Sequence, residues 1–147
     1  MHVTAYAVTA MIGALLALQV GLNAMMRSYV GSAVVAALIN FLVGSVALAA
    51  AAFATRAPWP STTELGGIPW WVWLAGLGGA SYVAASAVVG PLIGGAAFVA
   101  LVVTGQMICS MTLDHFGVLG FPERSIDLPR IAGAVLMVVG VILLTRR

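Results

Sequence analysis

The amino-acid sequence predicts an all-α integral membrane protein with five transmembrane helices in a single domain, residues 1–147. Hydrophobic residues make up 63% of the chain and charged residues only 7%, whereas about a quarter of the residues of a soluble domain are charged. The apolar residues gather in five runs, each near the length of about 20 residues that a helix needs to cross a bilayer. These runs are apolar on nearly all sides, whereas the strands of a transmembrane barrel alternate apolar and polar residues.

The first two predicted spans lie close together near the N-terminus. The first covers residues 3–26 and ends before Arg27. It lacks the positively charged start of a signal peptide and is long enough to cross a bilayer, so we interpret it as a retained helix. The second covers residues 33–54 and is closed by Arg56 and Pro58.

The third predicted span follows a polar, proline-containing loop from Arg56 to Ile68. It covers residues 69–89 and begins with the aromatic cluster Trp70-Trp71-Val72-Trp73, a pattern typical of the interface between membrane and water. Gly90 and Pro91 are predicted to break this helix, since both residue types interrupt helical runs.

The fourth and fifth predicted spans cover residues 92–113 and 128–145. The fourth is expected to stop in the charged turn Asp114-His115-Phe116-Gly117. Asp127 followed by Pro129 predicts the start of the fifth helix, because an acid caps free N–H groups and proline fits the first turn.

Composition and spacing exclude several classes of function. The net charge of +2 comes from six arginines, four acids and no lysine, too little positive charge for binding nucleic acid. Cys109 is the single cysteine, so it forms no intrachain disulfide, and we interpret it as a packing residue. Asp114, His115 and Glu123 match no defined metal-binding spacing. With no catalytic set or phosphate-binding loop in the sequence, we expect no metal, no cofactor and no enzyme activity.

Polar side chains inside the apolar spans are the candidate binding residues. Polar groups are costly in lipid, so they face the interior of a helix bundle or a water-filled cavity. Several of them are spaced four apart, which places them on one face of a helix. The candidate substrate-binding residues are Gln19, Asn23, Asn40, Tyr82, Ser86, Gln106 and Ser110. The alternative is that these residues form hydrogen bonds between helices, an interpretation that we favour for Asn40 and Ser110.

Asp114 continues the stripe that Gln106 and Ser110 begin on the fourth span. It lies at the end of the apolar run, where a charged group reaches water at low cost. We therefore expect an interfacial structural role for this carboxylate, with a proton or cation site as the alternative.

The arginines are divided equally between the two sides of the membrane. Arg56, Arg124 and Arg130 fall on the side of the N-terminus, and Arg27, Arg146 and Arg147 fall on the other side. Because an excess of positive charge in short loops orients membrane proteins, the equal count predicts insertion in both orientations, with a single orientation as the alternative. Two oppositely oriented copies would form an inverted repeat, an architecture that many secondary transporters use.

Several segments together resemble the YdcZ-type family of the drug/metabolite transporter superfamily. They are Leu18-Gln19-x-Gly21-x-Asn23-Ala24, Ala37 to Gly44, Pro69 to Trp73, Gly105-Gln106 through Ser110 to Gly117, Gly120 to Pro122, and the final helix from Gly133 to Leu144. The resemblance covers nearly the whole chain, and it implies a five-helix, EamA-like half-transporter. Members occur as single genes, as oppositely oriented pairs or as fused ten-helix proteins.

The resemblance also implies roles for individual residues. In the superfamily the early helices of each repeat line a central cavity, so Gln19, Asn23, Tyr82 and Gln106 would face it. The related small multidrug resistance proteins carry a glutamate in the first helix that binds proton and substrate. Here Gln19 and Asn23 are the only polar side chains in the second half of that helix, which argues against proton antiport and against cationic substrates.

We therefore expect a multi-pass protein of the bacterial inner membrane that transports a small, neutral or weakly polar solute by alternating access. Its expected partners are membrane lipid, the solute and a second copy in antiparallel orientation, with an inverted paralogue as the variant. The alternatives are a passive channel of the same inverted architecture and a membrane assembly subunit that transports nothing. In the last case the polar side chains would only join helices.

Overall fold

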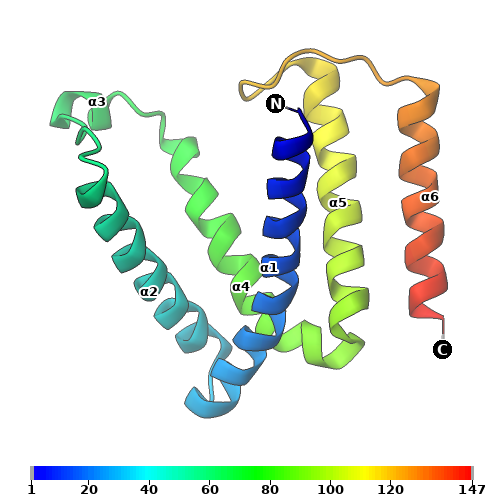
Figure 1. Cartoon of the computed structure of the whole chain (residues 1–147), viewed down its shortest axis with the longest axis horizontal. Helices are drawn as coiled ribbons and strands as arrows, with labels where there is room; N and C mark the ends of the chain where they lie inside the picture. Colours follow the sequence, from blue (N-terminus) through cyan, green and yellow to red (C-terminus); the bar gives the residue numbers. More distant parts are fainter. Residues whose placement is uncertain (1, 147) are drawn as a thin grey trace. The chain divides into compact units, whose positions relative to one another are not determined.

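The computed structural model describes residues 2–146, and it is built from helices joined by turns and loops (Figure 1). Five helical segments of the described chain are long and apolar enough to cross a membrane, which confirms the predicted fold class. They are Val3–Val30, Ala33–Ala54, Trp70–Ile93, Gly95–Phe116 and Leu128–Thr145. Arg147, which enters the arginine count, lies outside the described residues. The chain divides into two compact units, Met1–Pro91 and Leu92–Arg147, and a single domain stays a prediction.

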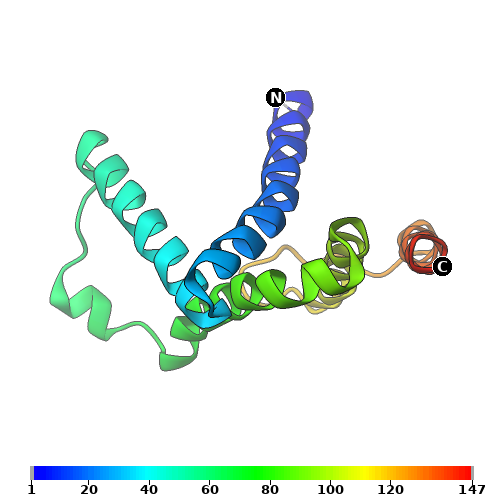
Figure 2. The same cartoon turned by 90° about the horizontal axis from the view of Figure 1, so that it is seen from below.

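In the first unit, α1 (His2–Val30) and α2 (Ala33–Ala54) diverge from the tight turn that joins them (Figures 1 and 2). Gly31 ends α1 with a φ of +77°, a conformation that glycine adopts at little cost because it has no Cβ. Its N–H donates to the carbonyl of Arg27 at 2.8 Å. The Ser32 hydroxyl then accepts a backbone N–H from the first turn of α2, so the turn satisfies groups at the ends of both helices.

The loop after α2, which the sequence predicts as polar and irregular, contains a short helix, α3 (Thr62–Gly66). Ser61 and Glu64 form a capping box, in which the Ser61 N–H donates to Glu64 Oε2 at 2.7 Å. Hydrogen bonds from the backbone and then the side chain of Ser61 lower the pKa of Glu64 below its ordinary value of 4.5. The carboxylate is therefore the form that holds this cap.

The third span begins with a 3-10 turn, η1 (Trp70–Trp73), and continues as α4 (Leu74–Ile93). The predicted break at Gly90 and Pro91 is wrong, because α4 continues through Pro91. Proline removes one hydrogen bond near the C-terminal end of α4, and the Ala87 carbonyl that this frees accepts from Arg27 instead. The helix instead ends before Gly94, whose φ is +90°.

Gly90 of α4 lies close against α1. A Cβ built on Gly90 would lie 2.7 Å from Cγ1 of Val20. Val20 itself is buried, and its β-branched side chain has little rotamer freedom in a helix. The two helices can therefore meet here only because residue 90 carries no side chain.

In the second unit, α5 (Gly95–Phe116) and α6 (Leu128–Thr145) run antiparallel and are joined by a loop (Figure 1). The expected charged turn at 114–117 is wrong in detail, since Asp114 to Phe116 are helical and Gly117 ends the helix with a φ of +57°. Asp127 is the N-cap of α6 and accepts from the Arg130 N–H at 2.9 Å, as predicted.

Asp114 joins the two helices of the second unit. Its carboxylate pairs with the guanidinium of Arg130, and its backbone carbonyl accepts from the Arg124 N–H at 2.7 Å. Arg130 Nη1 also donates to the Arg124 carbonyl at 2.9 Å. Asp114 thus has the structural role that its position at the end of the span predicted.

The close approach at Gly90 predicts the effect of adding a methyl group there. Gly90→Ala should destabilise the protein by about 1–3 kcal/mol, the usual cost of overpacking a tight contact. Gly76→Ala in the same helix is the matched control, because a Cβ at Gly76 meets nothing within 4 Å, and it should be neutral or slightly stabilising. Equilibrium unfolding with SDS in detergent micelles measures both changes. Equal effects of the two substitutions would contradict the contact.

Candidate functional site

Three of the predicted site residues meet in the first unit and form what we call the polar cluster: Asn23 on α1, Asn40 on α2 and Ser86 on α4. Asn40 Nδ2 donates to Asn23 Oδ1 at 2.7 Å, and Asn23 Nδ2 donates to Ser86 Oγ at 2.6 Å. Ser86 Oγ donates in turn to the Val83 carbonyl at 2.8 Å. This chain of hydrogen bonds joins all three long helices of the unit.

The polar cluster also stabilises the packing of the helices, because two of its three side chains are buried. Asn23 is 1% exposed and Ser86 is fully buried, so water cannot replace the bonds between them. The interhelical hydrogen bonding expected of Asn40 is present, and Asn23 and Ser86 also bond between helices. The amide oxygen of Asn40 is different, because it accepts no hydrogen bond within the described chain. Asn40 is half-buried, so it is the member of the cluster that can still bind a donor from a ligand.

A pocket of about 370 Å³ lies between α2 and α4 in the same unit. It is lined by Val34, Ala37, Leu38, Phe41, Ala80, Ser81 and Ala84. Pockets that bind small molecules start at about 300 Å³ and are mostly apolar with a few polar groups, and here the Ser81 hydroxyl is the one polar side chain of the lining. Sequence reasoning did not find this pocket, because small apolar residues in a membrane helix give no signal that distinguishes a cavity from packing.

Gln19 and Tyr82, the two remaining predicted residues of the first unit, are both half-buried. Gln19 lies one turn before Asn23 on α1, and within the described residues its amide has no hydrogen-bond partner. Tyr82 follows Ser81 of the pocket lining. The structure therefore brings Asn23, Asn40 and Ser86 into contact but does not bond Gln19 to them.

The predicted residues of the second unit form an exposed stripe. Gln106 and Ser110 lie on α5, both are exposed, and neither side chain has a hydrogen-bond partner among residues 2–146. Thr104 is the buried polar residue of this helix, with its hydroxyl donating to the Ala100 carbonyl at 2.8 Å. Exposed amide and hydroxyl groups in a spanning helix are unfavourable against lipid, so this stripe needs a polar surface or water beside it.

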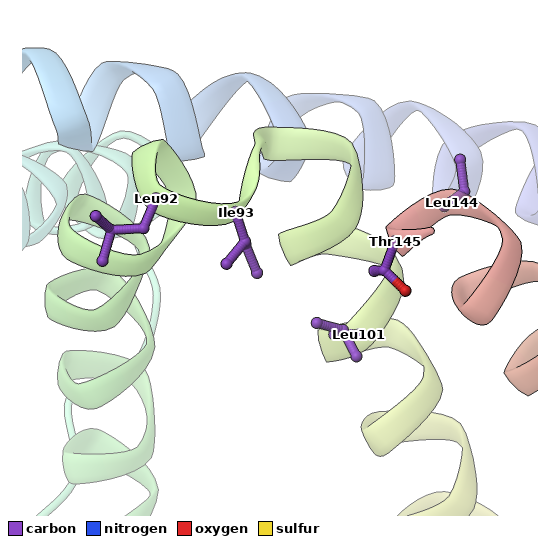
Figure 3. Close-up of a pocket in the computed structure, with 5 residues that line it drawn as sticks. All are labelled: Leu92, Ile93, Leu101, Leu144 and Thr145. Carbon is purple, nitrogen blue, oxygen red and sulfur yellow. The ribbon is translucent and has the colours of Figure 1, made fainter. Parts of the chain in front are cut away.

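A second pocket, of about 280 Å³, lies within the second unit (Figure 3). Its lining consists of Leu92, Ile93, Leu101, Leu144 and Thr145. The Thr145 hydroxyl already donates to the Val141 carbonyl at 2.9 Å, and the other four side chains of the lining are aliphatic.

The titratable residues of the described chain form no group of three or more His, Cys, Asp and Glu side chains that could hold a metal ion. Asp114 is paired with Arg130, and the His115 Nδ1 accepts weakly from the Ile126 N–H at 3.4 Å. These residues therefore fasten the end of α5 to α6 and to the loop between the two helices.

Long apolar helices joined by buried amide and hydroxyl groups define a multi-pass α-helical membrane protein. Residues 4–143 match the family described as "Putative inner membrane exporter, YdcZ". The chain is also 34% identical over 113 residues to "Inner membrane protein YdcZ" of Escherichia coli (strain K12), which covers 77% of this chain and 75% of that protein. No solved structure matches the chain.

The chain therefore belongs to the YdcZ family of inner-membrane transporters. This confirms the family resemblance and the expected location, a multi-pass protein of the inner membrane.

The polar cluster predicts unequal effects of two similar substitutions on α1. Asn23→Leu removes two hydrogen bonds and should destabilise the protein by about 1–2 kcal/mol, given about 0.6 kcal/mol for an average interhelical bond and more for a buried group left unpaired. Gln19→Leu, one turn away, removes no hydrogen bond described here and should change stability by less than about 0.5 kcal/mol. SDS unfolding in detergent micelles measures both. Equal losses would show that Asn23 is not a joint between helices.

Proposed function

We propose that the protein is a secondary transporter that moves a small, neutral or weakly polar solute by alternating access and works as an antiparallel homodimer. The observation that carries the proposal is the equal division of the six arginines between the two sides of the membrane. Without an excess of positive charge on either side, no orientation is favoured during insertion. Insertion in both orientations would let one sequence form both halves of the transporter.

The number of spans supports the same arrangement. Five membrane-length helices place the start of the first span and the end of the fifth on opposite sides of the membrane. Two copies in opposite orientations then form an inverted repeat, in which substrate sites lie near the middle of the membrane at the interface between repeats. A heterodimer with an inverted paralogue would give the same symmetry, and a strict bias of this chain toward one orientation would favour it.

The exposed stripe on α5 supports a second copy or a water-filled path beside this helix. Gln106 and Ser110 are both exposed and lack hydrogen-bond partners in the described chain. A surface of this kind is costly against lipid, and an interface with a second copy would cover it. Asn40 Oδ1 and the amide of Gln19 would add further polar groups for a solute to contact.

The solute is inferred from the groups that are available to bind it. The candidate site residues are amides and hydroxyls, and none of them carries a charge. The acid that lies nearest the stripe, Asp114, is paired with Arg130. A neutral or weakly polar solute therefore fits better than a cation, which would need an unpaired carboxylate.

The first test is the orientation of the chain in the membrane. A single cysteine placed after Thr145 in a Cys109→Ser background is labelled in intact cells with a membrane-impermeant reagent, before and after permeabilisation. About half of the molecules should be labelled from outside, because equal charge gives no preferred orientation. Labelling from one side alone would contradict the homodimer and direct the search to an inverted partner protein.

The second test separates a transporter from its alternatives. In proteoliposomes, influx of solutes from a panel of small neutral compounds should saturate, and a solute trapped inside should accelerate it. Gln106→Leu should lower that flux about two- to tenfold, the range expected for the loss of one hydrogen bond to the solute, with little loss of stability. Thr112→Val is the matched control, since this exposed residue of α5 points away from the stripe.

Flux that neither saturates nor responds to trapped solute would identify a passive channel. An absence of flux, with Gln106→Leu weakening only the dimer, would identify an assembly subunit.

A further inference from the structure

Pro91 leaves one carbonyl near the C-terminal end of α4 without its usual helical partner. In an α-helix each carbonyl accepts from the N–H four residues later, and for Ala87 that residue is Pro91. Proline has no N–H, so the Ala87 carbonyl loses its helical partner. Ala87 is only 1% exposed, and an unpaired carbonyl that water cannot reach is costly.

Arg27 supplies the missing hydrogen bond. Its Nη1 donates to the Ala87 carbonyl at 3.3 Å, across 60 residues of sequence. Arg27 lies in the last turn of α1, and its long, permanently charged side chain keeps its donors at every physiological pH. No carboxylate of the described chain lies within 4 Å of it, so the carbonyl is its one direct partner.

Arg27 acts together with two other residues of α1. Val20, Asn23 and Arg27 are spaced three and four apart and share one helix face. Val20 packs against Gly90, Asn23 bonds to Ser86, and Arg27 bonds to Ala87. One face of α1 therefore holds α4 throughout the segment that leads to Pro91.

We propose that Arg27 is a positioning residue for transport, because it provides the hydrogen bond that Pro91 withholds and so couples the C-terminal part of α4 to α1. The bond between Arg27 and Ala87 lies outside the ladder of α4, so it can break and re-form while the helix remains intact. The use of this bond in transport rests on the proposed function, whereas the coupling of Arg27 to Pro91 does not.

The Arg27 guanidinium can also be hydrated when it does not bond to the Ala87 carbonyl. It lines an open pocket of about 430 Å³ together with Ala24, Ser28, Gly31, Ala87 and Pro91. In this pocket water can satisfy the guanidinium donors, as it does for arginines at the ends of membrane helices. The guanidinium of Arg27 can therefore exchange the Ala87 carbonyl for water at a low cost in free energy. Leaving a buried carboxylate would cost much more, because it would leave a buried charge unpaired.

A double-mutant cycle tests the coupling. Arg27→Leu should lower the folding equilibrium constant about three- to tenfold, the range of interhelical bonds in membrane proteins. In a Pro91→Ala background the N–H of residue 91 can serve the carbonyl, so the same substitution should cost less than about twofold. Arg27→Lys should recover part of the loss, since an ammonium also donates. Equal losses in both backgrounds, measured by SDS unfolding in detergent, would overturn the proposal.

Arg56→Leu is the matched control for charge. Arg56 also follows a membrane helix, and within the part of the chain described here its side chain has no hydrogen-bond partner. Removing it should change the folding equilibrium constant less than about twofold. A loss as large as that of Arg27→Leu would mean that charge at the membrane surface, and not the freed carbonyl, explains the effect.

Hydrogen exchange distinguishes positioning from general stability. Arg27→Leu should accelerate exchange at the amides of residues 88–90, 92 and 93 more than in α2, and Arg27→Lys should restore the slower rate. An increase spread evenly over α1, α2 and α4 would overturn the positioning role. If the coupling is found and the wild-type protein transports no solute of the panel, the proposed function fails while the link between Arg27 and Pro91 stands.

Discussion

The structure depends on one constraint, which is that backbone polar groups in hydrocarbon must find partners within the protein. Most helix ends meet it locally. Glycines with positive φ end α1, α4 and α5, and Asp127 caps the start of α6. Pro91 is the exception, because the carbonyl that it frees, that of Ala87, accepts its hydrogen bond from Arg27 on another helix. The packing of α1 on α4 therefore also supplies the hydrogen bond that the backbone of α4 lacks at Ala87.

Polar side chains are used differently in the two units. In the first unit Asn23, Asn40 and Ser86 point inward and bond to one another, so most of their capacity joins helices. In the second unit Gln106 and Ser110 point outward and bond to nothing in the described chain. Chemically similar residues thus fall into two groups. The buried group stabilises the packing of helices, and the exposed group is available for contacts outside the described chain.

Sequence reasoning predicted the five spans well, because span length follows from the thickness of the bilayer and needs no tertiary contact. The start of α6 followed from Asp127 and Pro129, whose capping is local. The prediction failed at Pro91, since whether proline ends a helix depends on a distant donor that no local pattern reveals. The helix α3 was overlooked although Ser61 and Glu64 carry a capping-box signal. For the site, the sequence identified the polar residues but could not say which would bond to one another, because i and i+4 spacing fixes a face and not its neighbour.

The aromatic turn before α4 has a consequence for spectroscopy. All four tryptophans of the protein lie between residues 59 and 73, and all four are exposed. Tryptophan fluorescence therefore reports on residues 59–73 of the first unit alone, and the second unit contributes nothing to it. Emission wavelength would measure how deep that end sits in the headgroup region, where tryptophan prefers to lie. In vesicles, a water-soluble quencher added outside would reach the tryptophans of outward-facing molecules only, so the quenched fraction would count orientations without any label on the protein.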